Sequence, residues 1–361
     1  MFKFKKLVTV GLICAMLASF SVTAWATTER KNNEHSNVQY ELISITDIDK
    51  HPDVQAVLTE NNIVIDTYDS AMLAEKEKYV KQVNYYLQEE GISPLTTNEI
   101  EMIQQKYGLT ESANEYLESQ LAEDYQILVQ YDSETQAIGN VWKITPTVTS
   151  TGFSMKISNV GDPIDNITGT VTWYKMNGTS WTTDSGNTSR FSKSNVKNGV
   201  FYTWTITSQY VAEKFEYNYT VLEDGTGHTY NNKDKDNYIR YNFTAGAYSA
   251  IKPLGGERHH FVSQNALSAY KYNTNQAFAI RMTHADHKKT GSWGSSNAAI
   301  AFRTTEKEYL ANGQYQELLF FETNDMKAKL DSYEKTKLST KYSAEIVACL
   351  GYYESLFGIS D

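Results

Sequence analysis

The stretch GTVTWYKM, from Gly169 to Met176, alternates hydroxyl-bearing and apolar side chains. β-Branched and aromatic residues in period-two alternation are typical of a strand with one buried face. Similar runs follow in VFYTWTITSQYV (Val200 to Val211) and FEYNYTVLE (Phe215 to Glu223). Because turn sequences rich in Asn and Gly separate these runs, the pattern predicts an antiparallel β-sandwich of Ig-like style over residues 140–250.

The segment before the sandwich, residues 27–139, predicts helices. Ser70 to Gly91 offers Ser70 as an N-cap, and Thr96 to Gly108 begins with the Thr-x-x-Glu of a capping box. A third helix is expected from Thr110 to Tyr131. The many acidic residues of this region indicate a solvated face, or alternatively a surface for a basic partner.

The segment after the sandwich, residues 251–361, mixes both kinds of element. A strand is expected over Ala277 to Met282, and helices over Ser296 to Gly313, Gln314 to Leu330 and Tyr342 to Phe357. A length of 361 residues fits two or three domains. The chain is therefore predicted to be a multidomain α+β protein, with an N-terminal helical region, a central β-sandwich and a C-terminal α+β domain.

The first 26 residues have the pattern of a secretory signal peptide. A basic start, MFKFKK, precedes a short apolar run, and Ala24-Trp25-Ala26 has the small-residue pattern of a cleavage site. We expect cleavage after Ala26 and secretion to the extracellular space or cell surface, without stable membrane association; a retained anchor is the alternative. Cys14 would leave with the signal, so Cys349 remains alone and is expected to be a buried apolar residue, not a nucleophile.

Charge is distributed unevenly along the chain, whose net charge is −10. Residues 27–140 contain 7 Lys and Arg against 22 Asp and Glu, whereas residues 251–303 contain 7 against 2. An acidic chain is unlike a passive coat protein for nucleic acid. A locally basic segment is nevertheless compatible with a groove that binds a polyanion.

Four of the 7 histidines lie in this basic segment, in the stretches GGERHHFVS and THADH. Imidazole is a common ligand of zinc and similar metals, and it is also a general base near neutral pH. His259 and His260 should point to opposite faces of an extended segment, so they cannot easily share one role. His284 and His287 would lie on one side of a helix.

This conjunction of histidines and cations predicts phosphodiester hydrolysis. In such chemistry a divalent ion clamps the scissile phosphate, a neutral imidazole takes a proton from the attacking water, and nearby cations hold the phosphates. The cations that flank the histidines are Arg258, Arg281, Lys288 and Lys289.

The stretches ERHHFVS and THADH resemble the His-His and downstream His pattern of the HNH, or ββα-metal, nucleases, which include nuclease domains of bacterial toxins such as the colicins. The wider block, from RHH to AFAIRMTHADHKKTGSWGSSNAA, is similar to C-terminal nuclease-like domains of bacterial polymorphic toxins. The resemblance covers roughly residues 251–357, less than a third of the chain.

Carried over residue by residue, the resemblance implies a metal site and a base. The implied ligands of a divalent ion (Mg, Mn or Zn) are His259, His284, Asp286 and His287. His260 is implied as the general base, with Arg258 as a second catalytic residue. HNH enzymes also carry an Asn between their His groups, and that role stays open among Asn265, Asn273 and Asn275.

The turn SWGSS, Ser292 to Ser296, is expected to start the next helix with Ser295 or Ser296 as its N-cap. A phosphate seat made of its backbone amides is the alternative. Arg303 follows one or two helical turns later, and it is expected either to bind substrate phosphate or to form a surface ion pair.

These features predict a secreted, metal-dependent endonuclease of bacterial toxin type, with nucleic acid as its substrate and an immunity protein as a further partner. The alternative is a non-catalytic secreted surface or adhesion protein, with the sandwich as its binding module and a structural metal at the histidines. Structural zinc sites normally use cysteine ligands, which this segment lacks, and this favours catalysis. A hydrolase of another class is the third hypothesis, although the chain has no His-Glu-x-x-His motif of common zinc proteases.

Overall fold

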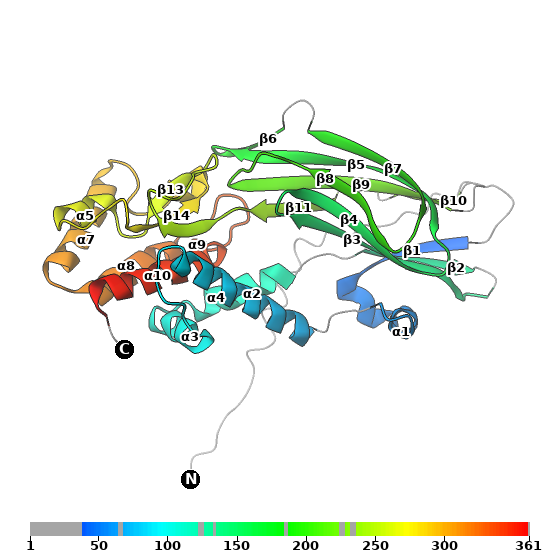
Figure 1. The fold of residues 1–361 in the computed structure, drawn as a ribbon, viewed down its shortest axis with the longest axis horizontal. Coiled ribbons are helices and arrows are strands. Elements are labelled where there is room, and N and C mark those ends of the chain that lie inside the picture. The colour runs from blue at the N-terminus through cyan, green and yellow to red at the C-terminus, as the bar shows by residue number, and fades with distance from the viewer. Residues whose placement is uncertain are drawn as a thin grey trace, which may run out of the picture.

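The chain forms an elongated molecule with a β-rich part at one end and a helix-rich part at the other (Figure 1). The structure is a computed structural model, and it describes residues 38–63, 68–121, 126–132, 135–183, 187–223, 228–231 and 236–359. Mixed helices and antiparallel sheets confirm the predicted α+β class. The predicted signal peptide, residues 1–26, lies outside the described residues. Within them, no helix combines the length and the apolar character needed to cross a bilayer.

Two antiparallel sheets make up the β-rich part. The first has the order β1-β2-β3-β4-β8, and its strands are β1 (Val38–Ser44), β2 (Gln126–Asp132), β3 (Ile138–Thr149), β4 (Gly152–Val160) and β8 (Gly199–Thr205). The second is built around the paired strands β5 (Ile164–Asn177) and β9 (Ala212–Glu223). Its remaining strands are β6 (Ser180–Thr182), β7 (Thr188–Val196), β10 (His228–Asn231) and β11 (Asp236–Tyr241).

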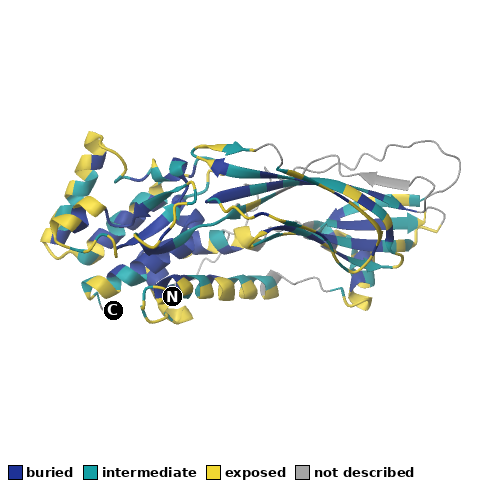
Figure 2. Cartoon of the chain, turned by 45° about the horizontal axis from the view of Figure 1, so that its top comes forward, coloured by how far each residue is buried: buried dark blue, intermediate teal, exposed yellow. Residues whose placement is uncertain are grey.

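The two sheets bury a common core because their strands alternate. In β9 every second residue from Phe215 to Val221 is buried, so aromatic side chains form one face of the strand. This face meets the first sheet, where the rings of Phe153 and Phe215 stack with centroids 5.5 Å apart. Figure 2 shows the same alternation of buried and less buried positions along the long strands. The strand prediction is confirmed for Gly169 to Met176 in β5 and for Phe215 to Glu223 in β9, whereas in the stretch Val200 to Val211 the strand β8 ends at Thr205.

A short N-terminal unit covers part of the other face of the first sheet. It consists of η2 (Ile45–Lys50) and α1 (Pro52–Glu60), which follow β1. Val54 and Leu58 of α1 pack with Ile127 and Val129 of β2. Strand β2 is therefore buried on both faces, since Leu128 lies in the core between the sheets.

The helix-rich part combines segments from both ends of the chain. From the N-terminal side come α2 (Tyr68–Gln88), α3 (Thr97–Lys106) and α4 (Thr110–Leu121). From the C-terminal side come a three-stranded sheet of order β12-β14-β13, with strands β12 (Thr244–Ala247), β13 (Glu257–His260) and β14 (Phe278–Met282). The C-terminal helices are α5 (Gln264–Ala269), α6 (His284–His287), α7 (Asn297–Ala311), α8 (Tyr315–Ala328), α9 (Leu338–Lys341) and α10 (Ser343–Phe357).

Helix α10 is the centre of this part, and residues 343–350 are all buried. The hydroxyl groups of Tyr79 and Tyr86 on α2 bond to Ser343 (3.0 Å) and Glu345 (2.8 Å) of α10. On its other side, the hydroxyl of Tyr353 donates to the carbonyl of Phe278 in β14 at 3.2 Å. Helices α2–α4 and the C-terminal segment thus share one hydrophobic core.

The structure changes three local expectations. The helix expected from Thr110 to Tyr131 ends at Leu121, and residues from Gln126 onward form β2, which pairs with β1. Helix α2 begins at Tyr68, so Ser70 lies inside it and is not its N-cap. The segments 27–139, 140–250 and 251–361 also do not correspond to three separate cores, because β1 and β2 belong to the first sheet while α2–α4 pack with the C-terminal segment. The capping box of α3 is confirmed, with Thr96 and Glu99 bonded reciprocally.

Candidate active site formed by histidines and a glutamate

Strand β13 and helix α6 are brought together by the small sheet. Strand β13 pairs with β14, and Glu257 lies opposite Met282, the last residue of β14. The chain then turns directly into α6, because Thr283 caps it by accepting a 3.1 Å hydrogen bond from the amide of Asp286. The histidines of α6 therefore lie next to the start of β13.

The alternation of β13 divides its four residues between two environments. Glu257 and His259 share one face, which meets α6, and Arg258 and His260 share the other, which meets Tyr248. This confirms the expectation that the adjacent histidines point to opposite faces. It also separates the two histidines into different sites.

Glu257 is the centre of the first environment. Its two carboxylate oxygens accept hydrogen bonds from Nδ1 of His284 and Nδ1 of His287. The side chains of Glu257 and His284 are each 29% exposed and that of His287 is 17% exposed, so the cluster is partly open to solvent. The ring of His259 lies beneath it, 5.1 Å from the ring of His287 between centroids. The expectation that His284 and His287 lie on one side of a helix is confirmed.

The cluster favours an ionised glutamate beside neutral imidazoles at His287 and His259. Burial raises the pKa of Glu257, but the hydrogen bonds from His287 and His284 outweigh it and hold the pKa below its usual value. Burial lowers the pKa of His287, and the hydrogen bond to Glu257 only partly opposes this. Burial, with smaller contributions from His287 and His260, holds the pKa of His259 well below its usual range. Because each Nδ1 donates to the carboxylate, the Nε2 atoms of neutral His284 and His287 carry lone pairs.

His259 has an unsatisfied polar atom. Its side chain is 3% exposed, and its Nδ1 has no hydrogen-bond partner among the described residues. The ring therefore stays neutral and supports the position of His287 by contact.

His260 and Arg258 occupy the second environment. The ring of His260 stacks on Tyr248 with centroids 4.0 Å apart, and its Nε2 donates to the carbonyl of Thr274 at 3.0 Å. The guanidinium of Arg258 lies 3.9 Å from the centroid of the same tyrosine and donates to its carbonyl at 2.9 Å. A carbonyl oxygen only accepts, so Nε2 of His260 carries the proton and is not the ring nitrogen that could take one from a water molecule. His260 and Arg258 lie on the face of β13 opposite Glu257, and their expected catalytic roles stay predictions.

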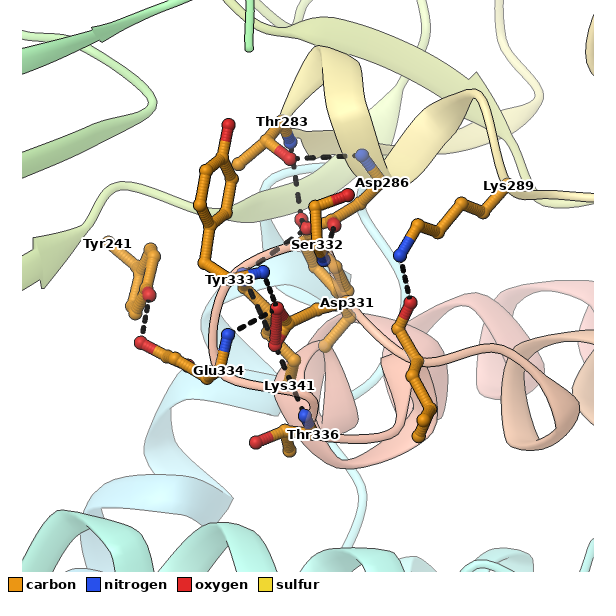
Figure 3. A network of polar contacts seen from close by, with 12 residues as sticks. Tyr241, Thr283, Asp286, Lys289, Asp331, Ser332, Tyr333, Glu334, Thr336 and Lys341 are labelled. Atoms are coloured by element: carbon orange, nitrogen blue, oxygen red, sulfur yellow. Dashed lines mark hydrogen bonds and ion pairs between the residues drawn. The ribbon is translucent and has the colours of Figure 1, made fainter. Parts of the chain in front are cut away.

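Asp286 needs correction as a metal ligand or ligand-orienting residue. Its carboxylate is fully buried and belongs to a separate network of polar contacts (Figure 3). There it accepts hydrogen bonds from the hydroxyl of Tyr342 at 2.8 Å and from the amide of Ser332 at 3.2 Å. Helical spacing explains the difference, because Asp286 lies between the two histidines on another side of α6.

The cations predicted to bind phosphate differ in whether they already bond to backbone carbonyls. Arg281 donates to the carbonyls of Asn242 (2.6 Å) and Lys252 (2.9 Å), and Lys289 donates to the carbonyl of Leu330 (2.6 Å). Arg303 holds the SWGSS turn by donating to the carbonyls of Ser292 (2.5 Å) and Gly294 (2.9 Å). Lys288 is exposed, and its Nζ lies 5.4 Å from the ring centroid of Trp293, which is 38% exposed. Lys288 is thus the predicted cation that remains available next to the cluster.

The turn SWGSS leads into helix α7, as expected from its serines. Ser296 is the N-cap of α7 and accepts a hydrogen bond from the amide of Ala299 at 3.2 Å. This selects Ser296 over Ser295 for that role. Cys349, fully buried in α10, also matches its expected structural role.

The implied metal site is not assembled by these residues. In the part of the chain that the structure describes, no group of three or more His, Cys, Asp and Glu side chains is placed to hold a metal ion. Both oxygens of Glu257 already accept from imidazoles, and Asp286 lies in another network. The four implied ligands therefore do not converge on one point.

Glu257 is the residue of the candidate site that the set predicted from the sequence does not include. It precedes His259 by two positions, so an extended segment places both on the same face. This spacing is readable in the sequence ERHH, where the glutamate adjoins the histidine pair.

Comparisons with models of protein families, with curated proteins and with solved structures find no match. The resemblance to HNH nucleases therefore stays a prediction. What the cluster can do follows from its own chemistry, which is that of two imidazoles oriented by one carboxylate.

Proposed function

We propose that this chain cleaves phosphodiester bonds in nucleic acid, with His287 and His284 as an acid–base pair oriented by Glu257. The observation that carries the proposal is the bidentate contact of the Glu257 carboxylate with both Nδ1 atoms. A carboxylate at Nδ1 fixes the tautomer and the orientation of an imidazole, which is what a general base needs. The partial exposure of the three side chains allows a substrate to reach them.

Each histidine has a separate part in this mechanism. His287 is the more buried of the two and its pKa lies below the usual value, so its Nε2 is free to take a proton from the nucleophile at neutral pH. We assign His284 as the acid that donates a proton to the leaving oxygen, because its ring is the more exposed of the two and can exchange protons with solvent. Glu257 stabilises the positive charge that forms on His287 as the proton moves.

RNA is the substrate that these side chains can cleave by acid–base chemistry alone. The 2′-hydroxyl of RNA is an internal nucleophile, so the base only has to remove its proton. Hydrolysis of DNA needs an activated water molecule, for which a divalent ion is the usual source. Lys288 and Trp293, next to His287 in the chain, offer a cation for a phosphate and an exposed ring for a base.

The test is a cleavage assay on labelled RNA and DNA, with EDTA or with added Mg²⁺, Mn²⁺ or Zn²⁺. We expect RNA cleavage in EDTA that falls about 100-fold or more in His287→Gln and His284→Gln. His51→Gln is the matched control, because His51 lies before α1 in the β-rich part and should leave the rate unchanged. Cleavage that depends on added metal would restore the metal-dependent mechanism, and absence of cleavage of either substrate would reject the nuclease proposal.

The second candidate function is binding without catalysis by the β-rich part. It is supported by a shallow groove of about 500 Å³ on the second sheet. The polar residues that line this groove are Thr168, Thr170, Arg190, Ser192, Asn218 and Thr220. This function would be favoured if the protein had no nuclease activity and if His287→Gln and His284→Gln bound a ligand of the second sheet as tightly as the wild-type protein does.

The finer fold and context assignments belong to the same proposal. An Ig-like sandwich would serve to attach or deliver a nuclease-like C-terminal segment, as in secreted bacterial toxins. An immunity protein would then cover the Glu257 cluster in the producing cell. The delivery role of the sandwich and the immunity protein both require the nuclease activity that the cleavage assay tests.

A further inference from the structure

Lys341 lies close to two buried carboxylates, those of Asp286 and Asp331 (Figure 3). It is the last residue of α9, and its side chain is 3% exposed. Its Nζ lies 3.2 Å from Oδ2 of Asp286 and 3.9 Å from Oδ2 of Asp331, and both aspartate side chains are fully buried. Nζ nevertheless makes no hydrogen bond of acceptable geometry with any described residue. A buried, imperfectly paired amine is costly unless the site uses it.

Three aromatic rings lie around the amine of Lys341. Nζ lies 4.8 Å from the ring centroid of Tyr241 and 6.0 Å from those of Phe243 and Tyr333. The hydroxyl groups of Tyr241 and Tyr333 are held by Glu334 and by the carbonyl of Thr179. The amine and the carboxyl group of Asp286 are thus both buried, with side chains 3% and 0% exposed.

The two aspartates have different hydrogen-bond environments. Asp331 accepts from three backbone amides, those of Tyr333 (2.5 Å), Glu334 (2.7 Å) and Thr336 (3.3 Å), which stabilise it as a carboxylate. On Asp286, one amide donor, that of Ser332, points at Oδ1 (3.2 Å), and the Tyr342 hydroxyl points at Oδ2 (2.8 Å). The three amides hold Asp331 in place with Oδ2 3.9 Å from Nζ of Lys341, where it can exchange protons with the amine, and Asp286, whose Oδ2 lies 3.2 Å from Nζ, is the nearer carboxyl group and the one suited to react at its carbon.

We propose that Lys341 and Asp286 form an intramolecular isopeptide bond, with Asp331 as the proton carrier. The ammonium group of Lys341 gives one proton to Oδ2 of Asp286, and the neutral amine attacks Cγ. The amide of Ser332 stabilises the negative charge that develops on Oδ1. Asp331 takes a second proton from the nitrogen and passes it to Oδ2, the Cγ–Oδ2 bond breaks, and one water molecule leaves. The third proton stays on the amide nitrogen, and no oxidant or other reactant is needed.

The bond would tie α6 to the junction of α9 and α10. Helix α6 carries two histidines of the glutamate cluster, and α10 is the centre of the helix-rich core. A covalent link between distant residues stabilises a fold chiefly by restricting the unfolded chain. Since the described cysteine is single and buried, this link would supply a constraint that a disulfide supplies in other exported proteins.

The test is the intact mass of the denatured wild-type protein, followed by protease digestion and tandem mass spectrometry. We expect a mass lower by one water molecule than the sequence requires. We also expect one branched peptide that joins the segments containing Asp286 and Lys341. The full sequence mass in the wild-type protein, or a water loss located at any other pair of residues, would overturn the proposal.

Variants identify the reacting groups. Lys341→Arg keeps the positive charge but removes the nucleophile, and it should restore the full mass. Lys337→Arg is the matched control in the preceding turn, since Lys337 is more exposed and lies near Glu111 and Glu115, and it should still lose water. Asp331→Asn should leave most molecules unlinked, and complete linkage in that variant would remove Asp331 from the mechanism. Because the wild-type mass alone decides whether the bond exists, the test does not depend on the folding of any variant.

Discussion

Replacement of Glu257 by Gln is the change that examines the candidate site most sharply. Gln keeps one carbonyl oxygen, so one imidazole retains an acceptor while the other faces an amide that can only donate. The variant therefore loses at least one hydrogen bond to a charged group, worth about 1.5–3 kcal/mol. If that bond strengthens as His287 becomes protonated, the loss corresponds to a fall of about 10- to 100-fold in the cleavage rate.

The assay combines a pH–rate profile with an NMR titration of the histidine rings. The Glu257 hydrogen bond opposes the effect of burial on His287, so its removal should lower the pKa of His287 further. The acidic limb of the rate profile should then move to lower pH, because the base must be deprotonated. Glu308→Gln, at an exposed position of α7, makes the same charge change away from the cluster and should alter neither readout. A Glu257→Gln protein with an unchanged rate and an unchanged His287 titration would refute the orienting role of the carboxylate.

Three further predictions concern stability. The pKa of His259 is lowered in the folded state, so as the pH falls the unfolded chain takes up a proton at this residue before the folded chain does. The free energy of unfolding should therefore decrease below about pH 6.5, by up to about 1.4 kcal/mol per pH unit. Urea unfolding should show that this pH-dependent loss is absent in His259→Phe. Burial and the neighbouring Glu306 carboxylate raise the pKa of Glu322 well above its usual value of 4.5, so stability from its protonated form is lost as the pH rises from that value to the raised pKa. Over this rise Glu322→Gln should lose less melting temperature than the wild-type protein. Thr96→Ala removes the capping box of α3 and should cost about 1 kcal/mol in urea unfolding, whereas Thr304→Ala, an exposed position inside α7, should cost little.

Secondary structure could be predicted from the sequence where the apolar residues or the capping residues have one clear spacing. The alternation of β9 and the Thr96–Glu99 spacing each determine an element without help from distant residues. Strand β2 behaved differently, because its apolar run Ile127-Leu128-Val129 is buried on both faces and has no period to distinguish strand from helix. Its pairing with β3, the next strand, and with β1, far away in the sequence, makes it a strand.

The packing of distant segments against one another could not be predicted from the periodicity of the sequence. The apolar residues of α10 indicate a helix packed in a core, but they do not say that α2, α3 and α4 supply the partners. The site shows the same limit. The shared face of Glu257 and His259 follows from strand period, whereas the contact of Asp286 with Lys341 depends on the path of the chain from Leu330 to Lys337.

The most direct test of the proposed acid–base pair is analysis of the ends of RNA cleaved by the purified protein in the presence of EDTA. Attack by the 2′-hydroxyl, assisted by His287 and His284, predicts products that end in a 2′,3′-cyclic phosphate and disappear with His287→Gln. Products with 5′-phosphate ends that form only when a divalent metal is added would contradict the account.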